Sequence, residues 1–306
     1  MTALKAPFPW FGGKSRAAPL VWEALGDVKN YVEPFAGSLA VLLGRPHAPH
    51  VETVNDLDCY LANFWRAVQA DPEAVARWAD APVNEADLSA RHQWLVDQAG
   101  FRESMKSDPD FFDAKIAGWW AWGLSAWIGS GWCDAKKYRS GSDGSPRVNR
   151  KKPSLGNAGM GVHSLTLSLP ERTLALADRM RRVRVACGDW QRVLSDVALG
   201  ARKPCGVFLD PPYQDVGMAY SAGHGRVSDA VREWAIANGD RADLRIVLCG
   251  YEGEHAMPDT WRAVEWKARV GYGKTAAALA NAHRERLWLS PACLGAGGQA
   301  ALENCS

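Results

Sequence analysis

The feature that most constrains the fold is an apolar segment that breaks abruptly into two prolines. Residues 207–209, Val-Phe-Leu, run directly into Asp210-Pro211-Pro212-Tyr213. Three successive apolar residues are typical of a buried strand in a parallel sheet, and proline cannot donate a hydrogen bond to a sheet ladder. The residue before a proline is also driven away from the helical region. We therefore expect a strand that ends at residue 209, followed by a rigid turn at the sheet edge where open α/β folds bind ligands.

This turn would bring a carboxylate, backbone carbonyls and an aromatic ring together. An exocyclic amine on an aromatic base is a poor nucleophile, because its lone pair is delocalised into the ring. Asp210 and the carbonyl of Pro211 could each accept one N–H of such an amine and localise the lone pair, while the Tyr213 ring stacks on the base. A helix-capping aspartate in a proline-rich turn is the simpler interpretation of a bare Asp-Pro-Pro sequence. The full apolar-Asp-Pro-Pro-Tyr string is more specific.

Length and composition exclude several classes of protein. The 306 residues fit one large domain or one domain with an insertion, and the net charge of +2 means that a nucleic-acid partner would need a local basic patch. The seven cysteines show no Cys-x-x-Cys spacing, so we expect no structural zinc, no other metal site and no disulfide framework. The sequence shows no signal-peptide pattern and no apolar run that could span a membrane, which predicts a cytoplasmic protein.

The amino-terminal segment, residues 8–14, reads Phe-Pro-Trp-Phe-Gly-Gly-Lys and precedes a helical pattern over residues 15–25. Two glycines before a lysine suggest a tight loop that feeds a helix N-terminus. Such a loop can hold a carboxylate or a phosphate, with Lys14 supplying charge. The GxxxxGK spacing of a P-loop is missing, and a capped helix start with a buried tryptophan is the alternative interpretation.

The next two motifs each follow an expected strand. Glu33-Pro34-Phe35-Ala36-Gly37-Ser38 joins a strand to a helix through a glycine, which lets the backbone approach a nucleotide closely. Asn55-Asp56-Leu57-Asp58 follows, with Asp56 placed 19 residues (56 minus 37) after Gly37. This separation is typical of an acidic residue that binds a ribose diol, although Asp56 could instead be only the N-cap of the next helix. The expected elements here are strands at 28–33 and 51–54 and helices at 39–43 and 58–69.

Tryptophan and basic residues mark the middle of the chain. Five tryptophans fall within the 14 residues 119–132, which is more typical of a local core than of a base-stacking platform. Residues 133–152 then carry seven basic side chains against two acidic ones, a net charge of +5. A solvated flexible loop is the simplest interpretation, but beside a base-handling motif it also suits contact with phosphates. The basic residues are Lys136, Lys137, Arg139, Arg147, Arg150, Lys151 and Lys152.

A fourth strand end carries an acid and an aromatic ring. Cys187-Gly188-Asp189-Trp190 follows an expected strand, and Asp189 could accept from an adenine amino group while Trp190 lies against the ring. A turn with a buried tryptophan is the alternative. We expect mobility over the glycine-rich residues 214–228 and disorder after Ala292. The remaining expected elements are helices at 168–182 and 229–237 and strands at 183–186, 244–249, 261–270 and 284–289.

Through these motifs, the chain resembles the Dam-like, or D12, class of S-adenosylmethionine-dependent DNA adenine-N6 methyltransferases. The resemblance covers most of residues 7–70 and 163–290, and five separate motifs occur in the order typical of the family. Ser38 stands where the family commonly has a second glycine, and residues 133–162 depart from the pattern of enzymes that recognise GATC. The resembling motifs are PFPWFGGK, EPFAGS, NDLD, CGDW and DPPY, the last of which is the catalytic motif of the family.

The resemblance implies a seven-stranded Rossmann-like sheet, mostly parallel with one reversed strand, and a helical target-recognition insertion. The catalytic domain would comprise residues 1–70 and 166–306, and the insertion residues 71–165. Double-stranded DNA would be the partner, contacted by the seven basic residues of 133–152. The implied catalytic residues are Asp210, Pro211, Pro212 and Tyr213. The implied cofactor-binding residues are Trp10, Gly12, Gly13, Lys14, Glu33, Phe35, Gly37, Asp56, Leu57, Asp189, Trp190 and Asp210.

The expected reaction is methyl transfer to N6 of a flipped adenine in a specific duplex sequence, by a bacterial or phage-encoded enzyme. Two alternatives remain at this point: an RNA or small-molecule amine methyltransferase of the same fold, and a DNA-binding regulator without turnover. The basic segment argues against a small-molecule substrate, and the intact Asp210, Tyr213, Asp56 and Lys14 argue against a regulator. A homodimer on a palindromic site is compatible with the sequence. The target sequence and a cognate restriction enzyme cannot be read from it.

Overall fold

The chain folds into two compact units that each combine separate stretches of sequence. In the computed structural model, one unit comprises Met1–Trp10 with Asp56–Gly188, and the other comprises Phe11–Asn55 with Asp189–Ser306. Within the parts of the chain that the structure describes, no helix has both the length and the apolar character needed to cross a membrane. The described residues are 4–10, 12–128, 131–134, 161–163, 168–213, 224–266 and 284–295.

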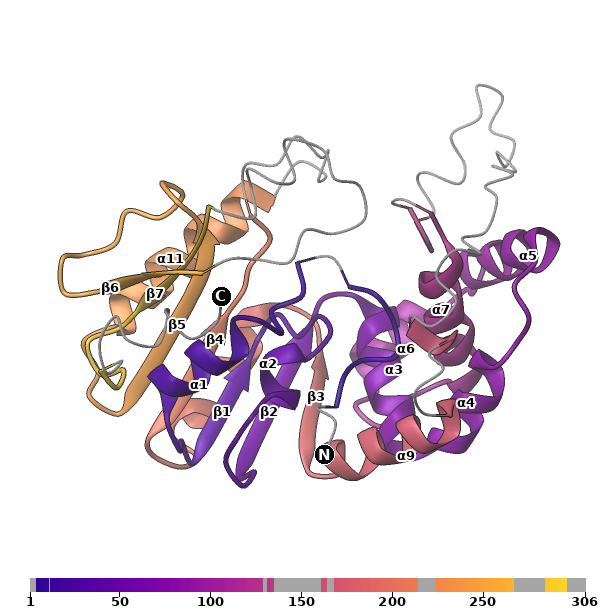
Figure 1. Cartoon of the computed structure of the whole chain (residues 1–306), viewed down its shortest axis with the longest axis horizontal. Helices are drawn as coiled ribbons and strands as arrows, with labels where there is room; N and C mark the ends of the chain where they lie inside the picture. Colours follow the sequence, from indigo (N-terminus) through magenta and orange to yellow (C-terminus); the bar gives the residue numbers. More distant parts are fainter. Residues whose placement is uncertain are drawn as a thin grey trace. The chain divides into compact units, whose positions relative to one another are not determined.

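The strands form a seven-stranded sheet in the order β3-β2-β1-β4-β5-β7-β6. Strand β1 pairs in parallel with β2 and β4, and β4 pairs in parallel with β5, while β7 runs antiparallel to both β5 and β6 (Figure 1). The predicted mostly parallel sheet with one reversed strand is therefore confirmed. The strands are β1 (Asn30–Glu33), β2 (Val51–Asp56), β3 (Val183–Cys187), β4 (Cys205–Leu209), β5 (Leu244–Tyr251), β6 (Arg262–Glu265) and β7 (Glu285–Leu289).

The strand order contains a reversal of winding between β1 and β4. From β1 the chain proceeds to β2 on one side of the sheet, and from β4 it proceeds to β5 on the other. In open α/β sheets such a switch point, at the carboxyl ends of the strands, is where ligands bind. Glu33 ends β1 and Asp210 directly follows β4. Two carboxyl groups thus lie at the position where this topology is expected to bind a ligand.

Strand β4 confirms the strand predicted before the two prolines. All five of its residues are buried, as expected for a central strand covered on both faces. Gly206 lies under Leu25 and Val28, and a Cβ added there would come within 3.1 Å of a Val28 methyl group. The helices of the sheet-containing unit are α1 (Ala18–Leu25), α2 (Ala40–Leu43), α10 (Asp196–Leu199) and α11 (His224–Asn238), with the 3-10 helix η3 (Trp190–Val193).

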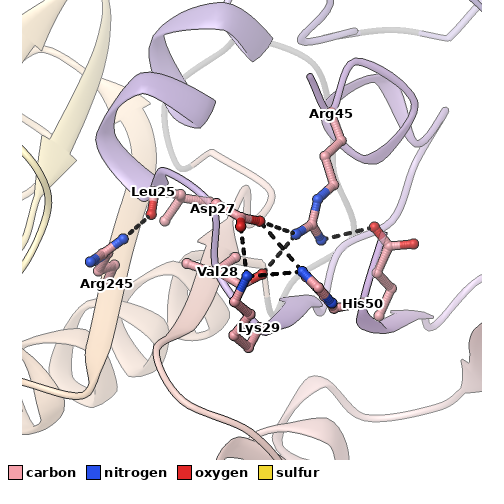
Figure 2. Close-up of polar contacts among 8 residues, drawn as sticks. Leu25, Asp27, Val28, Lys29, Arg45, His50 and Arg245 are labelled. Atoms are coloured by element: carbon pink, nitrogen blue, oxygen red, sulfur yellow. Dashed lines mark hydrogen bonds and ion pairs between the residues drawn. The ribbon is translucent and has the colours of Figure 1, made fainter. Parts of the chain in front are cut away.

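A polar cluster lies at the opposite edge of this unit, where the parallel strands begin (Figure 2). Arg45 donates to the Val28 carbonyl at 2.7 Å and forms an ion pair with the buried Glu52 at 3.1 Å. Lys29 contacts the carboxylate of Asp27 at 2.6 Å. These bonds attach the segment before β1 to β2, so the cluster has a structural role. It lies at the amino-terminal ends of the parallel strands, whereas Glu33 and Asp210 lie at the carboxyl ends.

The helical unit is built around aromatic side chains. The Phe8 ring packs against Phe64 and Trp120 with centroid distances of 5.0 Å, and Trp120 and Trp122 are almost fully buried. Trp119, Trp127 and Trp132 are half-buried. The interpretation of the tryptophan-rich stretch as a local core is therefore confirmed. The helices are α3 (Cys59–Ala70), α4 (Pro72–Ala79), α5 (Glu85–Val96), α6 (Phe101–Ser107), α7 (Ala114–Ala126) and α9 (Leu169–Met180), with the 3-10 helix η2 (Gly161–His163).

Three expectations from the sequence are wrong in detail. Helix α11 begins at His224, so residues 224–228 are helical rather than part of a mobile loop. Strand β6 ends at Glu265, short of the predicted residue 270. Leu294 was expected to be disordered, but its N–H donates to the Ala24 carbonyl at 2.8 Å. The hydrogen bond to α1 fixes this residue through a contact distant in sequence, which local composition does not reveal. Residues 214–223, 267–283 and 296–306 lie outside the described residues.

Candidate active site

Asp210 follows the last residue of β4 and forms a buried ion pair with Lys14. The Lys14 ammonium lies 3.0 Å from Oδ1 of Asp210 and also donates to the Gly12 carbonyl at 3.0 Å. The Lys14 side chain is 5% exposed, whereas that of Asp210 is 21% exposed. The contacts that described residues make with this carboxylate involve Oδ1. Among the described residues, none contacts its second oxygen, Oδ2, which could therefore accept a hydrogen bond from a ligand.

Tyr213 joins Asp210 to a second buried carboxyl group. Its hydroxyl lies 3.1 Å from Oδ1 of Asp210 and 2.9 Å from Oε2 of Glu285, the first residue of β7. The Tyr213 ring packs edge-on against Tyr251 at a centroid distance of 4.6 Å, and the Lys14 ammonium lies 5.0 Å from its centre. The ring is therefore fixed at its edge and at its hydroxyl.

The charges in this cluster alter one another's pKa values. Burial alone would lower the pKa of Lys14, but the negative charges of Asp210 and Glu285 outweigh it and raise that pKa above its usual range. Burial raises the pKa of Glu285, an effect that Lys14 opposes and Asp210 reinforces. Burial and the Asp210 charge likewise raise the pKa of Tyr213. Lys14 thus stays a cation near neutral pH, and Tyr213 keeps its proton.

Glu33 is a third buried carboxyl group, at the end of β1. It accepts a hydrogen bond from the Tyr31 hydroxyl at 2.9 Å and another from the backbone N–H of Leu42. Burial raises its pKa to about 8, and the negative charge of Asp210 contributes in the same direction. Glu33 is therefore mostly protonated at neutral pH and acts as a neutral polar group.

Because of this raised pKa, we expect Glu33 to make the protein less stable as the pH rises. Between the ordinary value of 4.5 and about 8, the unfolded chain releases the Glu33 proton while the folded chain retains it. Stability then falls across that window. Glu33→Gln should remove this loss and stabilise the protein at pH 8 by on the order of 1–3 kcal/mol relative to the parent. Urea unfolding at pH 5 and pH 8 measures the free energy of unfolding of each variant. Glu23→Gln, at an exposed position of α1, is the control. Equal pH dependence of stability in Glu33→Gln and the parent would contradict the prediction.

The remaining predicted cofactor residues of the sheet-containing unit lie around its turns. Gly12 and Gly37 adopt positive φ angles of 73° and 48°, which glycine tolerates, and Gly13 comes directly after Gly12. Phe35 stacks on Trp190 with ring centres 6.2 Å apart and an interplanar angle of 29°. The buried Trp190 and half-buried Phe35 thus form an aromatic pair.

Asp189 has a structural role in the turn that follows β3. Its side chain accepts a hydrogen bond from the N–H of Gln191 at 2.9 Å and caps the 3-10 helix η3. Asp189 is exposed and Trp190 is buried. The turn with a buried tryptophan, considered as an alternative, is therefore present. It does not exclude a contact between Asp189 and a ligand, because an aspartate carboxylate can accept several hydrogen bonds.

Three predicted cofactor residues belong to the helical unit. Trp10 packs against Phe8 at a centroid distance of 6.0 Å. The Asp56 side chain accepts from the N–H of Asp58 at 2.9 Å, and Leu57 is 65% exposed. The N-cap of α3 is Asp58, which accepts from the N–H of Tyr60, so the interpretation of Asp56 as the helix cap is wrong. An exposed leucine beside a strand-end carboxylate is compatible with a ligand that covers it.

The seven basic residues predicted to contact DNA lie outside the described residues. They are Lys136, Lys137, Arg139, Arg147, Arg150, Lys151 and Lys152, all within the undescribed range 135–160.

Glu285 is the main site residue that the sequence analysis missed. It was assigned only to a closing strand, yet it is 5% exposed and lies 3.9 Å from Lys14 as well as contacting Tyr213. Because β7 is antiparallel, its first residue lies opposite Tyr251, near the carboxyl end of β5. An acidic residue between two arginines, just before the apolar residues 287–289, was the available signal, but the direction of the strand was needed to interpret it.

Comparison with known protein families connects this geometry to an activity. Residues 10–104 match the family model of the D12 class N6 adenine-specific DNA methyltransferases. Over these residues the resemblance to the D12 class that the motifs predicted is confirmed, and the family consists of enzymes that methylate adenine in DNA. The matched range contains the last five residues of PFPWFGGK and all of EPFAGS and NDLD, while CGDW and DPPY lie beyond it. A comparison with curated proteins found no match.

Proposed function

We propose that this D12-class chain transfers a methyl group from S-adenosylmethionine to N6 of an adenine extruded from a specific duplex DNA sequence. The observation that carries the proposal is the position of Asp210 and the contacts of its carboxylate. This carboxylate lies at the switch point of the sheet, is held through Oδ1 by Lys14, and has no contact at Oδ2 with any described residue. A carboxylate held in this way can orient a substrate amine without moving itself.

In the proposed mechanism, Asp210 and the carbonyl of Pro211 each accept one N–H of the adenine amino group. These two hydrogen bonds direct the nitrogen lone pair out of the ring plane, toward the incoming methyl group. Pro212 has no N–H and so offers no competing donor in the turn. Tyr213 stacks on the face of the extruded base. Most of the acceleration then comes from in-line positioning of the two reacting atoms.

The residues present fit S-adenosylmethionine as the methyl donor, which supplies an electrophilic methyl group on a positively charged sulfonium. The glycine turns with positive φ at Gly12 and Gly37 permit close approach of a ligand to the backbone. The buried indole N–H of Trp266 has no hydrogen-bond partner among the described residues, and the ring that carries it lies 5.8 Å from the Lys14 ammonium. Among the proposed cofactor residues, Lys14 would pair with the methionine carboxylate, and Asp56 would accept from the ribose hydroxyls.

We expect Asp56→Ala and Lys14→Ala each to weaken S-adenosylmethionine binding by about 1–3 kcal/mol, because each removes a charge-assisted hydrogen bond. Isothermal titration calorimetry measures the affinities. Asp27→Ala and Lys29→Ala are matched controls, since both residues belong to the polar cluster at the start of the parallel strands. Unchanged affinity in both test variants would show that the cofactor is placed wrongly. Asp56→Ala is the cleaner test, because Lys14→Ala also leaves Asp210 without its ion pair.

We further propose that residues 71–165 form the target-recognition region and that its basic segment follows the DNA backbone. Each phosphate contact displaces condensed counterions and adds roughly 0.9 to the magnitude of the negative slope of log affinity against log salt. Replacing Lys151 and Lys152 together by Ala should therefore lower the magnitude of that slope by up to about 2, and weaken binding to target and non-target duplexes alike.

A salt titration of binding to two duplexes, with and without the target site, measures this effect. Lys29→Ala with Lys203→Ala is the control pair, because these exposed lysines precede β1 and β4 at the opposite strand ends. An unchanged slope in the Lys151/Lys152 variant would contradict a phosphate-contacting role. Loss of target preference at an unchanged slope would instead assign base recognition to these lysines.

The experiment that tests the function as a whole is expression in a bacterial host without DNA methylation, followed by sequencing of the host DNA for modified bases. We expect N6-methyladenine at one recurring sequence. N4-methylcytosine would indicate a different acceptor amine. Absence of any modified base would favour one of the alternatives, an RNA or small-molecule methyltransferase or a regulator without turnover.

A further inference from the structure

The catalytic motif contacts a carboxyl group that comes from another strand of the sheet. Glu285 starts β7, more than seventy residues after Tyr213, and its Oε2 lies 2.9 Å from the Tyr213 hydroxyl. The same carboxyl group lies 3.9 Å from the Lys14 ammonium, which pairs more closely with Asp210. Glu285 is thus a second acid beside the ion pair that holds Asp210.

The Tyr213 hydroxyl has one proton but two carboxyl neighbours. It lies within hydrogen-bonding distance of both Asp210, at 3.1 Å, and Glu285, at 2.9 Å, and it can donate to only one of them at a time. When Glu285 accepts this proton, the lone pairs of Asp210 stay free for a substrate amine. The Tyr213 ring is then fixed through its hydroxyl without any demand on the catalytic carboxylate.

The surroundings of Glu285 favour such a specific role over a general structural one. A buried carboxylate is costly unless it is paired and hydrogen-bonded, and its partners here are Lys14 and Tyr213. Other ionisable groups near it are Asp210, Glu254, Cys249 and Tyr251. Two arginines, Arg284 and Arg286, flank Glu285 in the sequence. The Arg286 side chain forms ion pairs with the exposed Glu252 and Glu265.

We propose that Glu285 is a positioning residue of the methyl-transfer site, which holds the Tyr213 ring in the orientation that receives the target base. This inference rests on the proposed function, since it assigns to Tyr213 the stacking role described above. Glu285 touches neither substrate nor cofactor in this scheme and acts through the Tyr213 hydroxyl. Its carboxylate also attracts the Lys14 ammonium, which therefore stays between Asp210 and Glu285.

The test compares Glu285→Ala with the isosteric Glu285→Gln. Glu285→Ala removes the acceptor and should lower kcat about 10-fold or more, the effect of a lost hydrogen bond to a charged group, with KM for S-adenosylmethionine little changed. Glu285→Gln retains a carbonyl oxygen that accepts from Tyr213 and should recover most of that loss. Glu265→Ala is the matched control, because it lies on the neighbouring strand, is 77% exposed and contacts only Arg286 among the pairs described for it.

A double-mutant cycle with Tyr213→Phe separates positioning through the hydroxyl from a general effect on the fold. If Glu285 acts through Tyr213, Glu285→Ala should lower kcat little further in the Tyr213→Phe background. The same cycle on the free energy of unfolding tests the contact without any need for activity. Additive losses in kcat, or a Glu285→Ala variant as active as the Glu265→Ala control, would overturn the proposal.

The outcomes also distinguish this proposal from the proposed function. A parent protein that does not methylate adenine, under conditions where it binds DNA and cofactor, overturns the proposed function and the positioning role with it. An active parent, an inactive Asp210→Ala variant and unaffected Glu285 variants overturn only the role of Glu285.

Discussion

Replacing Asp210 by Ala is expected to lower the rate of adenine methylation by roughly 10²–10⁴-fold, the range for loss of a catalytic carboxylate or of a preorganised hydrogen-bond partner. The physical reason is that the free oxygen Oδ2 would no longer accept the amine N–H and localise its lone pair. Asp210→Asn is the companion variant, because it keeps the shape and one acceptor oxygen but loses the charge. Single-turnover assays with radiolabelled S-adenosylmethionine measure the chemical step directly.

The controls for this prediction address the buried ion pair. Removing Asp210 leaves the 5%-exposed Lys14 with Glu285 at 3.9 Å as its remaining acidic neighbour. We therefore expect a modest fall in thermal stability, and calorimetric cofactor binding close to that of the parent. An Asp210→Ala variant that folds, binds cofactor and methylates at a near-normal rate would refute the mechanism. A variant that fails to bind cofactor would show that Asp210 acts in binding rather than in the chemical step.

Tyr213→Ala is expected to lose methylation far more than Tyr213→Phe. Stacking of a base on an aromatic ring contributes about 1–3 kcal/mol, so its loss corresponds to roughly a 10-fold to 100-fold effect. Phe keeps the ring and its packing on Tyr251 but loses the hydroxyl contacts with Asp210 and Glu285. Its smaller loss should equal that of Glu285→Ala, because both variants remove the same hydrogen bond.

Base extrusion can be followed directly alongside these rates. A 2-aminopurine placed at the target adenine should brighten when the parent enzyme binds, because the base leaves the DNA stack. Tyr251→Phe is a suitable control, since it keeps the ring that packs against Tyr213. Equal losses of activity in Tyr213→Ala and Tyr213→Phe would assign the role to the hydroxyl and contradict stacking. No change in fluorescence on binding would contradict extrusion.

The sequence by itself determined the central strands and the motifs at their ends. Two prolines after Leu209 fix the end of β4, because neither can continue a ladder, and the glycine of EPFAGS marks the turn after β1. These are local effects of backbone chemistry, so they can be predicted from the sequence without knowledge of distant contacts. The motifs were sufficient to indicate a resemblance to the D12 class, which the family match confirms over residues 10–104.

The tertiary structure decided which side chains meet and in what charge state. The pairing of Lys14 with a ligand carboxylate stays a prediction, and the structure adds that its ammonium lies 3.0 Å from Asp210, a residue 196 positions (210 minus 14) further along the chain. Glu33 carries a proton at neutral pH because it is buried, and burial is a property of the assembled sheet. Glu285 joins the site only because β7 runs opposite to β5, which brings its first residue to the edge where the parallel strands end. Spacing along the sequence cannot determine strand direction, since that depends on pairing between segments far apart in the chain.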